Sequence, residues 1–143
     1  MKLQFLITVC LFLRPTIAAA ASACDLISQT DAAAALGAGV SPPAHLGKPG
    51  GDQSCRYAAA DSALMITVSA GNGREKYEQA KARARNTESV PSLGDEAVYW
   101  SNAAKMNAVM VRKGDKAISI ALIGGKSSKA GVVDLARKAV SRM

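Results

Sequence analysis

Histidine and aromatic residues are scarce in this chain. Its 143 residues include a single His, one Trp, three Tyr and two Phe. The single histidine, His45, stands in a Pro- and Gly-rich stretch, without a Cys or an acidic residue at a spacing typical of catalysis. Acid–base catalysis near neutral pH most often uses His. The sequence therefore favours a non-enzymatic protein, and the alternative is an enzyme whose site is assembled from residues that form no motif.

Motifs for catalysis, cofactors and metals are also missing. The sequence contains no G-x-S-x-G and no phosphate-binding glycine pattern, and its adjacent acids Asp95 and Glu96 would diverge on a strand. We therefore expect no catalytic, cofactor-binding or metal-binding residues and no cofactor. A copper site is the alternative for His45 and the methionines at positions 65, 106 and 110, but methionine more commonly fills a core.

Long hydrophobic runs are limited to the start of the chain. An apolar run from Leu3 to Leu13 follows Lys2 and is followed by Pro15 and a series of small residues. This pattern predicts a signal peptide over residues 1–21, with cleavage after Ala21 preferred to cleavage after residue 18, 20 or 23. The run is shorter than the roughly 20 residues of a membrane span. We expect one exported domain, residues 22–143, in the periplasm or secreted, without a transmembrane helix; a retained N-terminal anchor is the alternative.

Charge is moderately positive. The formal net charge of +7 falls by two when Lys2 and Arg14 leave with the signal peptide. This excess is too small for a nucleic-acid-binding arm, so the expected partners are an envelope protein or an anionic polymer. If the two basic helices described below lie on the same side of the sheet, they form a cationic face; the alternative is an ordinary solvated surface. The candidate residues of this face are Arg74, Lys81, Arg85 and Lys138.

Only two cysteines, Cys24 and Cys55, remain once the signal peptide with Cys10 is removed. An even pair in an exported chain predicts a disulfide. Closing a loop of about 30 residues would stabilise the fold by roughly 3 to 4 kcal/mol. Alternatively, Cys24 is a lipidated first residue, because residues 21–24 faintly resemble a lipobox; the usual Leu three positions before the Cys is absent.

Alternating apolar residues predict strands. Residues 107–112 and 116–123 have period two and flank Gly114, which indicates a hairpin. A third strand is expected over residues 96–100, and a second hairpin over 54–60 and 63–70. The face carrying Val109, Val111, Ile118, Ile120 and Leu122 should be covered by helices.

Three helices are expected. The first spans residues 27–37, with Ser28 and Asp31 as a capping pair and Gly37 at its end; the second spans 74–86; the third follows Ser127 or Ser128 to the end of the chain. The Pro- and Gly-rich residues 38–53 predict an irregular loop. The fold class is therefore α+β, with two layers: an antiparallel sheet of about five strands covered by about three helices.

Tyr99 and Trp100 are neighbours on the third expected strand, so their rings point to opposite faces. One ring must therefore leave the helix-covered face. An exposed aromatic near Arg112 would form a recognition surface made by Tyr99, Trp100 and Arg112. The alternative is that Trp100 closes the edge of the core.

Four motifs stand out along the chain: C-D-L-I-S-x-x-D-A-A-A-A-L-G from Cys24, C-R-Y from Cys55, S-L-G-D-E-A-V-Y-W and V-x-K-G-D. In these motifs the chain resembles DUF3558-type proteins, which are small exported bacterial envelope proteins and lipoproteins of uncharacterised function. The resemblance implies an envelope location and an α+β fold, and it implies no activity. Together with the missing catalytic motifs, it leads to the hypothesis of a periplasmic binding or interaction module of unknown ligand, with a cationic protein that associates with envelope polymers or a membrane surface as the second hypothesis.

Overall fold

The computed structural model describes residues 22–37 and 39–143, so the predicted signal peptide and Ala38 lie outside the described residues. The elements follow the order η1 (Ala23–Asp25), α1 (Gln29–Leu36), β1 (Ala44–Gly47), β2 (Gln53–Ala58), β3 (Ser62–Val68), α2 (Gly73–Arg83), β4 (Glu88–Ser89), β5 (Glu96–Asn102), β6 (Met106–Lys113), β7 (Lys116–Gly124) and α3 (Lys129–Ser141). The α+β class is confirmed. None of the helices within these residues has the length and apolarity needed to cross a membrane.

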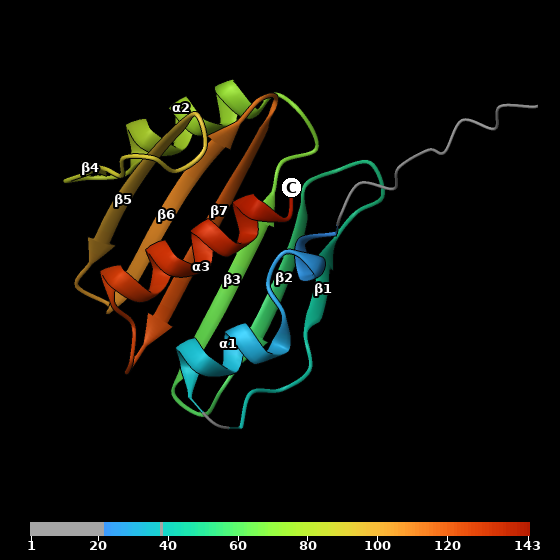
Figure 1. Cartoon of the computed structure of the whole chain (residues 1–143), viewed down its shortest axis with the longest axis vertical. Coiled ribbons are helices and arrows are strands. Elements are labelled where there is room, and N and C mark those ends of the chain that lie inside the picture. Colours follow the sequence, from blue (N-terminus) through green and yellow to red (C-terminus); the bar gives the residue numbers. More distant parts are fainter. Residues whose placement is uncertain (1–21, 38) are drawn as a thin grey trace, which may run out of the picture.

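All strands in the described part of the chain belong to one antiparallel sheet of seven strands in the order β1-β2-β3-β7-β6-β5-β4. Strands β1 to β3 form one meander and β4 to β7 form another. The two meanders meet where β3 pairs with β7, at the centre of the sheet (Figure 1). The expected number of about five strands was too low, because β1 and β4 extend the sheet at its two edges.

The two predicted hairpins are confirmed. β6 and β7 pair from Met106 opposite Ile123 to Lys113 opposite Lys116, and Gly114 turns the chain with a φ of 59°. β2 and β3 pair on the other side of β7. The expected third strand is β5, which is two residues longer than expected.

The prediction of an irregular loop over residues 38–53 was wrong in part, because β1 lies within it. Ala44 to Gly47 pair with β2 in register, from Ala44 opposite Arg56 to Gly47 opposite Gln53. Pro42 and Pro43 precede the paired residues, so neither removes a ladder hydrogen bond. β1 is an edge strand, and all four of its residues are exposed. The strand therefore has no alternation of buried and exposed residues that a sequence pattern could reveal.

The main core lies between one face of the sheet and helices α1 and α3, and we call this the first face. The branched residues expected to be covered by helices, Val109, Val111, Ile118, Ile120 and Leu122, are all buried there. Val132, Leu135, Ala136 and Ala139 of α3 pack against them. Both helices begin as predicted, since Ser28 and Ser128 accept hydrogen bonds from the backbone N–H groups of Asp31 and Gly131.

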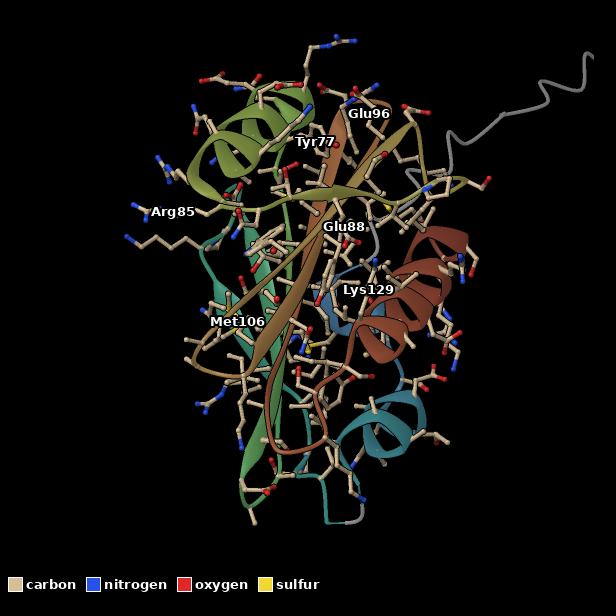
Figure 2. All side chains as sticks on the ribbon, turned by 90° about the vertical axis from the view of Figure 1, so that its left-hand side faces the viewer. Tyr77, Arg85, Glu88, Glu96, Met106 and Lys129 are labelled. Atoms are coloured by element: carbon tan, nitrogen blue, oxygen red, sulfur yellow. A yellow bond between two sulfur atoms is a disulfide. The ribbon has the colours of Figure 1, made fainter. Side chains whose placement is uncertain are left out.

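Helix α2 lies on the opposite face of the sheet, which we call the second face. Tyr77 of α2 packs against Val98, Met110 and Ala117, which alternate with the first-face residues on β5, β6 and β7. Figure 2, which looks along the sheet from the β5 side, shows α2 on one side and α1 and α3 on the other. Helices therefore lie on both faces of the sheet, and the two-layer prediction was wrong on this point.

The start of α2 is fixed by close backbone contact. The N–H of Gly73 donates to the carbonyl of Asp115 in the β6–β7 turn, over 2.8 Å. A Cβ at position 73 would lie 2.5 Å from the same oxygen, so only glycine fits without a shift of the turn. The helix ends at Arg83, three residues before the expected end.

Candidate functional site

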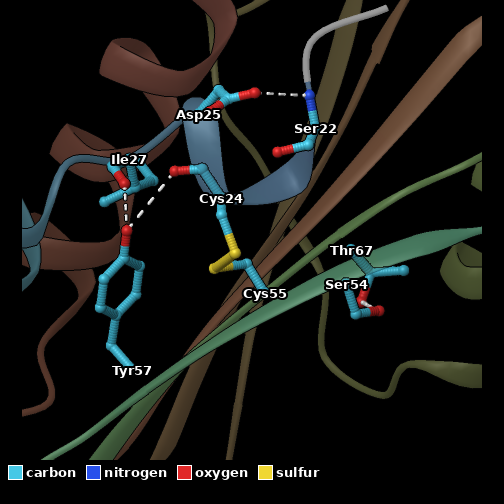
Figure 3. The surroundings of a disulfide bond; sticks show 8 residues. All are labelled: Ser22, Cys24, Asp25, Ile27, Ser54, Cys55, Tyr57 and Thr67. Carbon is cyan, nitrogen blue, oxygen red and sulfur yellow. Dashed lines mark hydrogen bonds between the residues drawn. A yellow bond between two sulfur atoms is a disulfide. The ribbon is translucent and has the colours of Figure 1, made fainter. Parts of the chain in front are cut away.

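The predicted disulfide is present. Cys24 of η1 and Cys55 of β2 are joined over an S–S distance of 2.09 Å, with both residues buried on the first face (Figure 3). The bond ties the N-terminal segment to the second strand of the sheet. It also occupies the sulfur of Cys24 that a lipid thioether would need.

Tyr57 lies beside this bond and was not singled out by sequence analysis. Its hydroxyl donates to the carbonyl of Ile27 at 2.5 Å, and the carbonyl of Cys24 lies 3.5 Å away (Figure 3). Burial raises the pKa of Tyr57, so the hydroxyl stays protonated as a donor at neutral pH. Two residues after Cys55 on the same strand, Tyr57 shares its face, and this spacing was the available signal.

Tyr99 and Trp100 lie on opposite faces, as expected for neighbours on a strand. Tyr99 is on the first face, where its hydroxyl bonds to Asn107 at 2.5 Å and the Lys129 ammonium stands 5.0 Å from its ring centre. Trp100 is half-buried on the second face, against the cluster formed by Tyr77 and its neighbours. The two rings therefore do not form one recognition surface.

Arg112 forms ion pairs within the β5–β6 hairpin to which it belongs. Its guanidinium bonds to Glu96 at 2.8 Å and to Asp95 at 3.0 Å, and the side chain is only 13% exposed. The hydrogen bond from Arg112 lowers the pKa of Glu96. Arg112 pairs with Glu96 in the sheet, four positions along β5 from Trp100, so the structure does not bring Arg112 and Trp100 together.

The candidate cationic residues divide between the two sides of the sheet. Arg74 and Lys81 belong to α2, and Arg85 follows it and points away from the sheet on the α2 side in Figure 2. Lys138 belongs to α3 on the opposite side, where it bonds to Asp31 at 3.1 Å and to Asp134 at 3.3 Å. The condition for one continuous cationic face, both helices on the same side, is not met.

Beyond α2, the second face is left uncovered. Strand pairing places its side chains in rows, and one row runs from Trp100 through Ala108, Ala121 and Met65 to Arg56. We define the open patch as the following partly or fully exposed side chains on the part of this face that lies beyond α2: Ala44, Leu46, Ser54, Arg56, Ala58, Ala63, Met65, Thr67, Trp100, Met106, Ser119, Ala121 and Ile123.

The open patch is unusual in its chemistry. Arg56 is its single charged residue, although a solvent-facing sheet surface is ordinarily polar. The two large hydrophobic residues exposed in the described part of the chain, Leu46 at 45% and Ile123 at 39%, both belong to it. The remaining positions are small, hydroxylated or methionine, apart from Trp100, the one tryptophan of the chain. A surface with a single charge and exposed large hydrophobic residues is typical of an interaction site.

Two cavities lie elsewhere. One, of about 450 Å³, opens between α2 and residues 87–98 and is lined by Tyr77, Lys81, Ser92 and Glu96, among others. Its two acids, Asp95 and Glu96, are both already paired with Arg112, as described above. The second, of about 480 Å³, lies at the end of the sheet near Ser22, Gly51 and Lys116.

Across residues 22–37 and 39–143, no three His, Cys, Asp or Glu residues are grouped as a metal site would require. His45 lies exposed on the edge strand β1. Met65 and Met106 lie in the open patch and Met110 is buried beneath α2, so the methionines of the copper alternative act as surface and core residues.

Comparison with models of known families, with curated proteins and with solved structures found no match. The resemblance to DUF3558-type proteins therefore stays an expectation from sequence motifs. The arrangement of the open patch is the feature from which a function can be argued.

Proposed function

We propose that the protein is an exported, non-enzymatic binding module that contacts its partner through the open patch. The supporting observation is the composition of the open patch, where Leu46 and Ile123 are exposed among small side chains and Arg56 is the single charge. Protein contact surfaces have few charged residues at their centre and are enriched in aromatic residues, Met and Arg. The patch shares the low charge and contains Trp100, two methionines and Arg56.

Export is part of the same proposal. The signal-peptide pattern of residues 1–21 and the Cys24–Cys55 bond both suit a periplasmic or secreted protein. Residues 22–143 would then form one domain, whose N-terminal segment is held to the sheet by the disulfide.

The described carboxylates support a non-enzymatic role. Hydrogen bonds lower the pKa of Asp31, Asp52 and Glu96. The main donors are the Ser28 hydroxyl for Asp31, the Ala70 backbone N–H for Asp52 and the Arg112 guanidinium for Glu96. Each acid is thereby held in its charged form next to a neighbour that it anchors, whereas a general acid needs a raised pKa. These groups act as structural ion pairs and caps.

Affinity capture from the native compartment under oxidising conditions tests the proposal. We compare the wild-type chain with Ala121→Glu and Ile123→Glu, which put a carboxylate into the open patch. Ala130→Glu is the matched control, because Ala130 is exposed at the start of α3 on the other side of the sheet. A partner that the wild type and Ala130→Glu retain and both patch variants lose is the expected result. Capture that is equal for all four proteins would contradict the proposal.

A second candidate function is association of α2 with an anionic envelope polymer. The supporting observation is that Lys76 alone among the basic residues of α2 has an ion pair in the described structure, with Asp52. Such contacts weaken steeply as salt is added, because exposed charges are screened. Binding of dextran sulfate that falls with ionic strength and with the double substitution Lys81→Glu, Arg85→Glu would support it, and salt-insensitive binding would exclude it.

A further inference from the structure

We infer that the occupant of the open patch is an amphipathic helix of a partner protein, with acidic residues flanking its apolar side. This inference rests on the proposed function, since it specifies what the binding face takes. It follows from the shape of the uncovered area, from the way α2 uses the same face, and from the charge around it.

The uncovered area has the dimensions of one helix lying beside α2. On β7, the positions Ser119, Ala121 and Ile123 belong to three successive rows, which span about 13 Å at roughly 3.3 Å per residue. A helix with its side chains is about 10 to 12 Å wide. From Trp100 on β5 to Arg56 on β2 the patch crosses four strand spacings, about 19 Å, which corresponds to about 13 helical residues at 1.5 Å each.

α2 shows how this face accepts a helix. Tyr77, a large side chain, sits over Ala117, a small residue on β7. The same strand continues with Ser119 and Ala121, which are equally small and are left half-exposed. Small residues in the sheet let large apolar side chains of a helix approach closely. The open patch therefore offers the same kind of packing surface as the one under α2, with no helix packed on it.

Charge favours an acidic partner. Arg56 lies within the patch, and Arg85 points outward on the same side of the sheet, below α2 in Figure 2. No acidic side chain belongs to the open patch as defined above. A helix that places Glu or Asp beside its apolar stripe would meet Arg56 with the opposite charge, which favours association and fixes its orientation.

A second copy of the chain fits this face less well. Two facing patches would bring Arg56 and the basic residues of α2 in each copy toward the same charges in the other. The formal net charge of +7 stays positive after Lys2 and Arg14 leave with the predicted signal peptide. The solvent side of α2 would also have to be buried, and it is charged along its length. Like charges across an interface disfavour association.

Trp100 provides a direct readout, because it is the only tryptophan of the chain and lies half-buried at one end of the patch. We titrate the full chain with a synthetic helical peptide that has a leucine-rich side flanked by Glu, and with its counterpart carrying Lys in place of Glu. Neither peptide contains aromatic residues. Arg56→Glu reverses the charge in the patch, and Arg137→Glu, an exposed position of α3 on the opposite side, makes the same change as a control.

The acidic peptide should shift the Trp100 emission to shorter wavelength and bind about ten-fold more tightly than the basic one, as expected for one charge contact worth about 1.4 kcal/mol. Arg56→Glu should abolish or reverse this preference, and Arg137→Glu should leave it unchanged. Equal binding of both peptides, or a preference that survives Arg56→Glu, would overturn the inference. So would an emission shift with phosphatidylglycerol vesicles and not with the peptides, or concentration-dependent dimerisation that Ile123→Glu abolishes.

These outcomes are separable from failure of the proposed function. If the peptides fail while the patch variants still lose a captured native partner, the face binds and the helical, acidic chemistry is wrong. If the patch variants retain every partner, the proposed function itself is wrong.

Discussion

Arg56 and Trp100 lie in one cross-strand row of the second face, with Met65, Ala121 and Ala108 between them. The row joins a cation on one meander to the single aromatic ring of the patch on the other. Arg56 and Trp100 are far apart in sequence and belong to different meanders. The pairing of β3 with β7 places them in the same row. The open patch is therefore a product of the topology.

The division of the sheet into a covered and an open face can be tested on one strand. Ile120 of β7 is fully buried on the first face, whereas Ile123 is 39% exposed on the second. Ile120→Ala should lower the free energy of unfolding by about 2 to 5 kcal/mol, because it leaves a cavity in the core. Ile123→Ala should cost less than about 1 kcal/mol. Chemical denaturation measures both values, and equal losses would contradict the assignment of faces.

The Tyr57 hydroxyl should contribute to stability. Tyr57→Phe leaves the carbonyl of Ile27 without its donor in a buried place, which should cost about 1 to 3 kcal/mol. Tyr77→Phe is the matched control, since Tyr77 is equally buried and has no hydrogen bond from its hydroxyl among the described residues. Tyr77→Phe should leave the free energy of unfolding, measured with denaturant, nearly unchanged. A loss for Tyr77→Phe as large as that for Tyr57→Phe would show that ring packing, and not the hydrogen bond, accounts for both.

The disulfide should account for a large part of the stability. Cys24 and Cys55 are 31 residues apart, and the double substitution to Ala should lower the free energy of unfolding by about 3 to 4 kcal/mol. Reduction of the wild type with dithiothreitol should give a similar loss. A change below about 1 kcal/mol in both experiments would mean that the disulfide is not needed for stability.

Asp31 joins the start of α1 to the end of α3, and its contribution should depend on pH. Hydrogen bonds from Ser28, Lys138 and Arg142 lower the pKa of Asp31 below its usual value of about 3.9. The stabilisation is therefore fully present well above pH 4 and is lost as the pH falls toward the folded-state pKa.

Asp31→Asn should cost about 1 to 2 kcal/mol at pH 7, a value reduced for the partial exposure of the two basic partners. The difference from wild type should shrink below about pH 4, where Asp31 becomes protonated in the unfolded chain. Asp134→Asn removes a more exposed partner of Lys138 and should change stability by less than about 0.5 kcal/mol. A difference for Asp31→Asn that stays constant from pH 7 to pH 3 would contradict the ion-pair interpretation.

Local patterns in the sequence predicted most of the elements. The period-two runs on either side of Gly114 and the Ser caps of α1 and α3 correspond to interactions between residues close in sequence, so they are visible without a structure. β1 was missed because Leu46 and its neighbours are an exposed edge paired with β2, and edge pairing leaves little trace in a Pro- and Gly-rich segment. β4 has two residues, too few to show a period.

The side of the sheet on which α2 lies could not be predicted. Its apolar stripe is thin, with Tyr77 and Ala80 as the contacting residues, and such a stripe fits either face. The choice is made by the contact of Gly73 with the β6–β7 turn and by the small residue Ala117 beneath Tyr77. Because this choice separates Lys138 from Arg74 and Lys81, it also decides which candidate surface exists.

Oxidation of methionines by hydrogen peroxide gives the most direct test of the open patch as a covered binding face in the native compartment. Met65 and Met106 lie in the patch, and Met110, buried under α2, is the internal reference. In purified protein, Met65 and Met106 should oxidise faster than Met110. In protein treated before release from its compartment, their rates relative to Met110 should fall, because a partner covers them. Equal relative rates in the two preparations would contradict the account.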